Sequence, residues 1–348
     1  MAENASGAIG VENSSVTRGG RSKARRGLRR RLAVASVGVL ALAGLGGCAG
    51  LGERMAKEDG KTTIAVVAKG YASPFWATVA EGVYAAGKDL KIEVTFNGPD
   101  TETDVVRQVD QVNLAYVKHP DAFVFAALDS SASVIALEQF QDAGIPVVAF
   151  DSGVPGSDIP LSTVATDNKA AAAEAAKHMI ELTGGKGELA VICHSSTSVT
   201  GTDRRDGFVE YIEANAPDMK IVDIQYNDSD QAKAEQQASA IIQAHPNLVG
   251  LFATDDDGAV ASAQTAKRSG KDVKVIGFDS GAVQIDLIKQ GSIAGSVTQN
   301  PYQMGYRAVE TALAASKGEE VPLVIDSGFY WYDANNLDDE EIQQAVYE

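Results

Sequence analysis

From Lys61 onward, short apolar runs rich in β-branched residues alternate with amphipathic stretches of helical period, and this alternation restricts the possible folds more than any other feature. The runs are continuously apolar, as expected for parallel strands that helices cover on both faces. The chain is therefore predicted to be an α/β protein of βαβ units with right-handed crossovers. Strands are expected at 62–67, 92–96, 122–126, 146–150, 189–193, 221–226, 249–253, 273–278 and 294–298, and helices at 75–90, 104–118, 133–143, 169–182, 205–214, 231–244, 259–269 and 282–290.

An internal repeat divides this pattern into two similar halves. Three short motifs occur twice in the same order: His119-Pro120, Phe125-Ala126 and Phe150-Asp151-Ser152-Gly153 return as His245-Pro246, Phe252-Ala253 and Phe278-Asp279-Ser280-Gly281. A chain of 348 residues also exceeds the size at which a single core stops growing, about 250 residues. Two doubly wound parallel-sheet lobes are therefore expected, each with a strand that ends in Phe-Asp-Ser-Gly.

Polar and aromatic residues follow the predicted strands at their carboxyl ends, where open parallel sheets bind ligands. They are residues 71–76, 129–130, 151–152, 255–257, 279–280 and 299–300. Aromatic rings stack on the C–H face of a sugar, while Asp, Asn, Gln and Arg pair with neighbouring hydroxyls. A cleft between two such sheets would suit a small ligand with many hydroxyl groups.

Several of these residues also have a purely structural interpretation. Phe75 and Trp76 are adjacent on a helix and must point different ways, so at least one is expected to face the cleft. Asp151 and Asp279 could cap helices, but their matching places in the repeat favour a ligand role. In the run 255–257, Asp255 is expected to face the ligand while one of its two neighbours caps the next helix.

Two arginines and one histidine also lie near the predicted strand ends. Arg204 and Arg205 are expected to begin a helix, with one of them donating a fork of hydrogen bonds into the cleft. His194 follows a strand and is the one histidine placed to approach the cleft.

The first fifty residues have the pattern of an export signal. Seven residues, 25–31, include five arginines, and the apolar run 32–45 that follows is too short to span a bilayer comfortably. It ends in Leu45-Gly46-Gly47-Cys48, which resembles a bacterial lipobox. This predicts a signal peptide over 1–47, a lipid on Cys48 and a tether over 48–60, through either the Sec or the twin-arginine route. The alternatives are an ordinary cleavage site or a short membrane anchor.

Charge and missing motifs exclude several classes of function. Residues 1–47 hold eight basic and two acidic side chains, which leaves 22 basic and 45 acidic ones in 48–348, a net charge of −23. Such a body repels nucleic acid. No phosphate-binding glycine loop, serine nucleophile motif or Cys/His metal spacing is present, so neither a cofactor nor a metal is expected. Cys193 is expected to be a small core residue.

Five motifs together resemble the ribose-type sugar-binding proteins of bacterial ABC importers. They are Ser73-Pro74-Phe75-Trp76, Phe150-Asp151, 203–208 (Asp-Arg-Arg-Asp-Gly-Phe), 275–279 (Val-Ile-Gly-Phe-Asp) and 298–301 (Thr-Gln-Asn-Pro). The resemblance runs from about residue 61 to about 325. Repressors of the LacI type share this fold but need an N-terminal helix-turn-helix, and this chain has an export signal in that place.

The resemblance implies a type I periplasmic binding protein, with two lobes that are joined by three crossover hinge segments and close around a buried ligand. The lobes would be 61–165 with 299–326, and 166–298 with 327–348, with crossovers near 165–167, 298–299 and Ser327. The implied ligand-binding residues are Ser73, the stacking aromatics Phe75 and Trp76, and the polar residues Asp151, Ser152, Arg204, Asp255, Asp279 and Gln299.

Four positions depart from the family pattern. The family often has Asn at position 73, Arg at 152 and Asn at 255, where this chain has Ser73, Ser152 and Asp255. An aromatic residue that is common in the family's second lobe is replaced near Ser229. The site thereby loses a guanidinium group and one ring, and gains a carboxylate. Because burying like charges is costly, three carboxylates against one arginine disfavour an anionic ligand. The pattern indicates a polyol other than ribose, or one that carries an amine.

The predicted protein is an exported, lipid-anchored, monomeric solute-binding protein, on the outer face of the cytoplasmic membrane or in the periplasm, that delivers a monosaccharide or related polyol to an ABC permease. It is not expected to be an enzyme. One alternative is a receptor that senses a furanose-like autoinducer and docks on a membrane sensor. The other is an exported enzyme that uses its aspartates as general acid and base.

Overall fold

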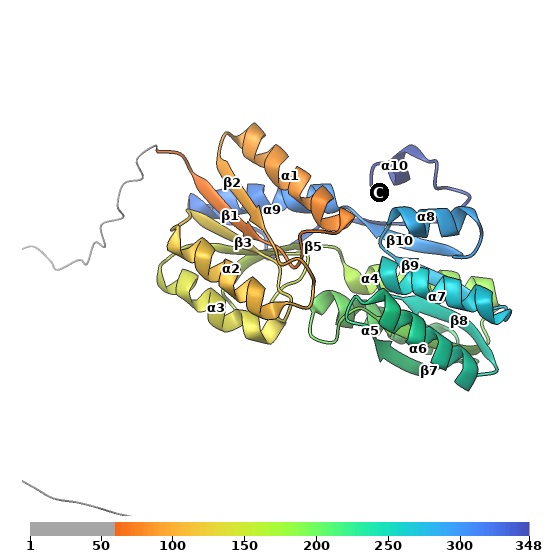
Figure 1. The fold of residues 1–348 in the computed structure, drawn as a ribbon. Helices are drawn as coiled ribbons and strands as arrows, with labels where there is room; N and C mark the ends of the chain where they lie inside the picture. Colours follow the sequence, from red (N-terminus) through yellow and green to blue (C-terminus); the bar gives the residue numbers. More distant parts are fainter. Residues whose placement is uncertain (1–59, 348) are drawn as a thin grey trace, which may run out of the picture. The chain divides into compact units, whose positions relative to one another are not determined.

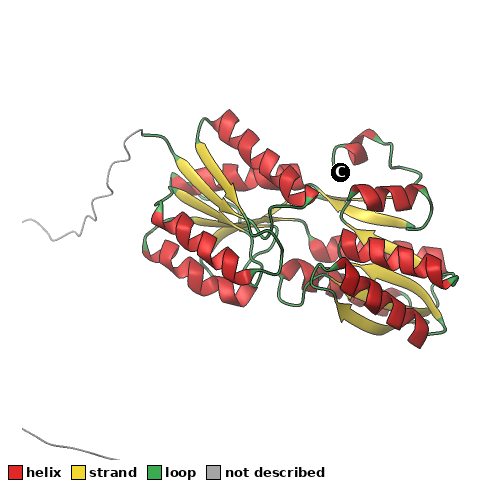
Figure 2. Ribbon diagram, in the orientation of Figure 1, coloured by secondary structure: helices red, strands yellow, loops and turns green. Residues whose placement is uncertain are grey.

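Two six-stranded sheets organise the part of the chain that the computed structural model describes, residues 60–347 (Figures 1 and 2). The predicted signal peptide, the lipid site Cys48 and the tether up to residue 59 lie outside the described residues. The first sheet contains β1 (Thr63–Val67), β2 (Glu93–Asn97), β3 (Ala122–Phe125), β4 (Val147–Phe150), β5 (Pro160–Ala165) and β11 (Val324–Asp326). The second contains β6 (Gly187–Cys193), β7 (Met219–Tyr226), β8 (Leu248–Ala253), β9 (Lys274–Phe278), β10 (Gly295–Gln299) and β12 (Phe329–Tyr332).

The two sheets share one topology. Their strand orders are β11-β5-β4-β3-β1-β2 and β12-β10-β9-β8-β6-β7, so corresponding strands take corresponding places. All paired strands run parallel except β12, which is antiparallel to β10. This confirms the predicted fold class, and the repeated Phe-Asp-Ser-Gly motif follows β4 in one sheet and β9 in the other.

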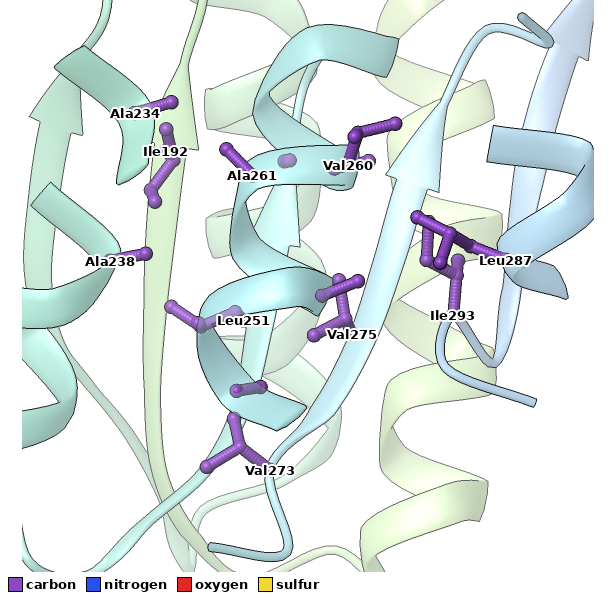
Figure 3. Packing of buried hydrophobic residues seen from close by; sticks show 14 of the residues in the cluster. Ile192, Ala234, Ala238, Leu251, Val260, Ala261, Val273, Val275, Leu287 and Ile293 are labelled. Carbon is purple, nitrogen blue, oxygen red and sulfur yellow. The ribbon is translucent and has the colours of Figure 1, made fainter. Parts of the chain in front are cut away.

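Helices cover both faces of each sheet. In the first lobe, α1 (Pro74–Leu90) and α9 (Pro301–Ser316) pack on one face, while α2 (Val105–Val117) and α3 (Ser130–Asp142) pack on the other. In the second lobe, α4 (Asn168–Thr183) and α5 (Val199–Asn215) cover one face, and α6 (Gln231–Ala244), α7 (Asp256–Ser269) and α8 (Ala282–Lys289) cover the other, joined by the short α10 (Glu340–Gln343). Figure 3 shows this second core, where small side chains of α6 and α7 let the helices approach β6, β8 and β9.

Helix caps at the ends of strands explain where the helices near the cleft begin. Ser73 precedes α1 and its hydroxyl accepts from the Trp76 amide, while Asn300 precedes α9 and accepts from the Gln303 amide. Both helices have proline in the first position, where the missing N–H group costs nothing. The caps therefore hold polar side chains at the carboxyl edge of each sheet.

All nine predicted strands form, with ends within two residues of their expected positions. The helix predicted from residue 205 begins earlier, at Val199, so Arg204 lies in its second turn and not at its start. Five elements have no counterpart in the sequence prediction: β5, β11, β12, α9 and α10. Four of them, β5, α9, β11 and β12, border the segments in which the chain passes from one sheet to the other.

The chain passes between the sheets after β5, after β10 and after β11, and these three segments meet. The Thr166 hydroxyl donates to Gln299 Oε1 at 3.1 Å and lies 3.2 Å from the Ser327 hydroxyl. All three side chains are buried. A single threonine thus links the three connections. Within residues 60–347, no helix has the length and apolar character needed to cross a membrane.

Candidate functional site

A cavity of about 90 Å³ lies among the carboxyl ends of strands from both sheets. Its lining residues are Lys69, Ser73, Pro74, Phe75, Trp76, Glu102, Asp151, His194, Thr200, Arg204, Ser229, Asp255, Asp256, Asp257, Asp279, Gln299 and Tyr347. Eight of the nine residues predicted to bind ligand are in this set. The exception is Ser152, which is fully buried with its hydroxyl 2.8 Å from that of Ser198, in the other lobe.

Asp279 is the centre of the polar network in the second lobe. Its Oδ2 accepts a charged hydrogen bond from Arg204 Nη1 at 3.3 Å, and its Oδ1 accepts from Gln299 Nε2 at 2.6 Å. Its backbone carbonyl accepts from Gln284 and from the Tyr332 hydroxyl, at 2.6 and 2.8 Å. The position of Asp279 is therefore fixed through both its carboxylate and its backbone carbonyl.

Arg204 is 3% exposed and has little freedom to move. Its guanidinium lies 3.7 Å from the ring centre of Phe278, a cation–π contact. Nε donates to Asn168 Oδ1, and Nη1 also donates to the Thr254 carbonyl, both at 2.8 Å. Such a fixed guanidinium presents its remaining donors to the cavity without first losing side-chain entropy.

Lys69 lines the cavity but is not among the residues that the sequence predicted there. Its ammonium lies 2.9 Å from Asp151 Oδ2 and 3.7 Å from Glu102 Oε2, and it donates to the Thr200 hydroxyl at 3.1 Å. Burial alone would lower the pKa of Lys69, but the charges of Asp151 and Glu102 outweigh burial and raise this pKa. Lys69 is therefore a buried cation that joins the first lobe to Thr200 in the second. It follows β1 directly, so the rule that drew attention to the other strand ends applies to it as well.

The two predicted stacking aromatics have different surroundings. Trp76 is 1% exposed, belongs to the core of the first lobe, and donates from Nε1 to Glu102 Oε1 at 2.7 Å. Its ring meets those of Phe75 and Phe150 edge to face. Phe75 is only partly buried and its ring lies 5.7 Å from that of Tyr347. The ring of Phe75 is thus the more accessible of the two, and the ring of Trp76 packs against it.

The acidic run of the second lobe differs from the expected arrangement. Asp255 caps α7, since its Oδ1 accepts from the Gly258 amide at 3.2 Å, whereas the sequence analysis assigned the cap to Asp256 or Asp257. All three carboxylates line the cavity. Burial, followed by the charges of neighbouring carboxylates, raises the pKa of each of them, to about 7 for Asp256.

His194 lies at the cavity as the sequence suggested, but as a neutral group. Its Nδ1 is 2.8 Å from the Thr254 hydroxyl and its Nε2 is 3.1 Å from the Thr200 hydroxyl. Burial, with the nearby charges of Arg204 and Lys69, lowers its pKa well below 6.5. The imidazole thus lies between the Thr200 and Thr254 hydroxyls of the second lobe, and Thr200 in turn accepts from Lys69 of the first lobe.

A second cavity is larger, at about 530 Å³, but is chemically poorer. The loop 153–158, β5 and the ends of β11 form most of its wall, with the carboxylates of Asp151, Asp158 and Asp203 and no Lys or Arg among its described lining residues. It also lacks aromatic side chains. We therefore place the functional site in the smaller cavity, where charged and aromatic groups converge from both sheets.

Two further chemistries find no support in residues 60–347. No group of three or more His, Cys, Asp or Glu side chains there is arranged to hold a metal. Cys193 is a buried free thiol in the core of the second lobe, and burial raises its pKa to about 12. Its thiol is therefore unreactive at neutral pH.

Known proteins provide independent evidence. The family model described as periplasmic binding protein domain matches residues 64–320. The D-ribose/D-allose-binding protein of Pseudomonas aeruginosa is 30% identical over 269 residues, covering 74% of this chain and 83% of that protein. The D-allose-binding periplasmic protein of Escherichia coli is 28% identical over 269 residues, covering 74% and 86%.

Solved structures agree with these sequence relatives. An ABC transporter solute-binding protein from Agrobacterium vitis with bound D-fucose has a TM-score of 0.78 and 33% identity, covering 82% of this chain and 100% of that one. A carbohydrate transporter solute-binding protein from Agrobacterium radiobacter in complex with D-arabinose has a TM-score of 0.76 and 30% identity, covering 82% and 99%. These relatives and neighbours are solute-binding proteins and not enzymes. The chain belongs to the periplasmic binding protein family, whose members bind solutes outside the cytoplasm.

Proposed function

We propose that this protein captures a monosaccharide or related polyol in the cavity between its lobes and delivers it to an ABC permease. The observation that carries the proposal is the preorganised network around Asp279, in which Arg204 and Gln299 are already oriented beside an aromatic wall. A sugar would find a carboxylate, a guanidinium and an amide ready to pair with its hydroxyls, and the ring of Phe75 ready to cover a C–H face.

The charge of the cavity supports a neutral or amine-bearing ligand. Six carboxylates line it, from Glu102, Asp151, Asp279 and the run 255–257, against the two cations of Lys69 and Arg204. Both cations are paired with carboxylates of the cavity wall. A sugar phosphate or sugar acid would have to displace one of these pairs, which is costly in a buried site.

We assign ligand contacts to seven of the eight predicted residues that line the cavity, together with Lys69, and a supporting role to the eighth, Trp76. Arg204 and Asp279 would bind ring hydroxyls from the second lobe, Gln299 from the hinge, and Asp151 with Lys69 from the first lobe. Phe75 would stack on the ligand, while Trp76 orients Phe75. Ser73, which is exposed, and Asp255, which is buried, would also contact the ligand, and both side chains cap helices.

We further propose that ligand capture involves closure of two lobes, 61–165 with 299–326 and 166–298 with 327–348. The hinge would be the point where Thr166 meets Gln299 and Ser327. Three hydrogen bonds join the two lobes across the cleft: Lys69 to Thr200, Ser152 with Ser198, and the Ser130 amide to the Thr197 carbonyl. These bonds would form on closing and break on opening, so Ser152 would act on the closed state and not on the ligand.

The route to the membrane follows from the N-terminal sequence. We propose that the signal peptide over 1–47 is removed and that a lipid on Cys48 anchors the monomeric protein through the tether at the outer face of the cytoplasmic membrane. Labelling cells with a radioactive fatty acid tests this, because a Cys48→Ala variant should incorporate no lipid and should appear in the soluble fraction.

Thermal unfolding of the purified protein with a panel of sugars tests the function. A ligand that binds only the folded state adds RT ln(1 + [L]/Kd) to its stability, about 4 kcal/mol at a thousandfold excess over Kd. The panel consists of D-ribose, D-allose, D-fucose, D-arabinose, D-tagatose and amino sugars. We expect a large shift with one sugar and a much smaller one with its epimer. No shift with any of them, after removal of carried-over ligand, would contradict the proposal.

A further inference from the structure

The C-terminal segment of the chain folds back onto the cavity and brings Tyr347 into its wall. Figure 1 shows α10 beside α8 and β10, and the residues after α10 continue to Tyr347. Tyr347 is 7% exposed and its ring lies 5.7 Å from that of Phe75, which belongs to the first lobe. The tail is thus a third source of cavity residues, besides the carboxyl ends of the two sheets.

Packing and hydrogen bonds hold this tail on the second lobe. Leu337 and Ile342 are buried in the core formed by α6, α7 and α8. The Tyr347 amide donates to the Ser280 hydroxyl at 3.1 Å, and the Thr298 hydroxyl donates to the Ala345 carbonyl at 3.2 Å. The position of the Tyr347 ring is therefore determined by the fold and does not depend on the ring's own contact with Phe75.

The hydroxyl of Tyr347 has no partner. Its oxygen is buried, and no described residue accepts from it or donates to it. Native proteins seldom leave a buried polar group unpaired, and such a group at a cleft indicates a missing ligand atom. Burial, together with the charges of Asp279 and Asp256, raises the pKa of Tyr347 well above 10, so the hydroxyl keeps its proton and can donate.

We infer that Tyr347 is a ligand-binding residue, with its ring and that of Phe75 forming the aromatic wall of the cavity and its hydroxyl donating to an oxygen of the bound polyol. The inference rests on the proposed function. Tyr347 would also be the aromatic side chain that the second lobe contributes to the cavity, since Phe75 and Trp76 both belong to the first lobe. The indole N–H of Trp76 is already bonded to Glu102. The C-terminal tail therefore contributes to ligand selection.

Calorimetric titration with D-ribose, D-allose, D-fucose, D-arabinose and D-tagatose tests the inference. For the sugar that the wild type binds, we expect Tyr347→Phe to weaken binding about tenfold and Tyr347→Ala more strongly. Tyr84→Phe, an exposed tyrosine of α1, is the matched control and should bind as the wild type does. Unchanged affinity in both Tyr347 variants would overturn the inference and leave the proposed function standing. Tighter binding by Tyr347→Ala would also overturn it, because the ring would then occupy space that the sugar needs.

Two further outcomes separate the inference from the proposed function. If the wild type bound none of the five sugars and none of the amino sugars of the thermal-unfolding panel, this would contradict the proposed function, and the inference with it. Hydrogen exchange at the amides of 345–347 shows whether the tail is seated. Protection that is equal in the wild type and Tyr347→Phe would assign the loss of affinity to the hydroxyl. Loss of protection in the variant would show a purely structural role and would overturn the inference.

Discussion

Asp151 and Asp279 occupy matching positions at the ends of β4 and β9, and both have a left-handed backbone, with φ of 53° and 69°. Each is ion-paired with a cation of its own lobe, Asp151 with Lys69 and Asp279 with Arg204. A residue other than glycine in this region is strained by about 1–2 kcal/mol. The repeat therefore preserves a strained carboxylate beside a buried cation, twice, at the edge of one cavity.

Two substitutions of Asp279 should distinguish the contribution of its charge from that of its hydrogen bonds. Asp279→Asn keeps a side chain that tolerates the left-handed backbone and still accepts from Arg204 or Gln299, so the fold should persist while sugar affinity falls about tenfold or more. Asp279→Ala removes the hydrogen-bond acceptors of Arg204 and Gln299 as well as the charge, and should also destabilise the protein, by about 3–5 kcal/mol. Calorimetry and urea unfolding of both variants check this. Equal stability of the two would contradict the structural role of the pair.

Lys69 should matter for stability before any ligand binds. Lys69→Met removes the partner of a buried carboxylate and should lower the free energy of unfolding by about 3–5 kcal/mol. In the double variant with Asp151→Asn much of this loss should return, because no uncompensated charge remains. A double-mutant cycle by urea unfolding measures the coupling, and additive losses would contradict the pairing.

Phe75 and Trp76 should respond differently to truncation. Trp76→Ala opens a cavity in the core of the first lobe and should cost about 3–5 kcal/mol of stability. Phe75→Ala, at a partly buried position, should cost less and yet abolish sugar binding. Thermal unfolding and calorimetry of the two variants decide this. Normal binding by Phe75→Ala would remove Phe75 from the proposed ligand wall.

Asp256 should make the protein more stable in mild acid. Its pKa is about 7 in the folded state, against about 3.9 for an unfolded aspartate. Between these two pH values Asp256 is protonated in the folded state and ionised in the unfolded state. Its contribution to the free energy of unfolding is therefore complete below about pH 4 and is lost as the pH rises through 7. Lowering the pH from 8 to 5.5 should raise the melting temperature of the wild type by at least about 2 °C relative to Asp256→Asn.

The comparison with Asp256→Asn isolates this effect from other groups. His194 has the opposite effect on the pH dependence of stability. Because folding lowers its pKa, the unfolded state takes up a proton first as the pH falls below 6.5, and the free energy of unfolding decreases. Asp255 and Asp257 also have raised pKa values. All three residues are present in both proteins, so their contributions largely cancel. If the melting temperatures of the two proteins changed by the same amount across this pH range, that result would contradict the raised pKa of Asp256.

Gly305 should be needed for the packing of α9 on α1. A Cβ atom there would collide with the backbone oxygen of Val79, and one at Gly82 would collide with that of Tyr302. Gly305→Ala should therefore destabilise the protein by about 1–3 kcal/mol through overpacking. Gly153→Ala, where a Cβ would have only ordinary contacts at 3.6 Å, is the control. Equal unfolding midpoints in urea would contradict the close helix contact.

The sequence was sufficient to predict the strands, the duplicated topology and the general place of the site. Buried parallel strands are continuous apolar runs, so their positions could be predicted to within two residues. The Phe-Asp-Ser-Gly repeat located both aspartates, because the carboxyl ends of parallel strands meet at one edge of a sheet. Of the five elements that escaped prediction, β11 and β12 are short edge strands, and the place of α9 is determined by its packing on α1.

Only the tertiary structure decided how neighbouring side chains divide their roles. Whether Phe75 or Trp76 faces the cavity depends on how α1 is rotated against its sheet, and whether Asp255 or Asp256 caps α7 depends on local backbone angles. No local pattern marks Tyr347, since its importance arises from a tail that packs on a core formed by residues far away in the sequence. Periodicity reports burial along one element, whereas a binding site is formed by side chains from several elements that only the packed fold brings together.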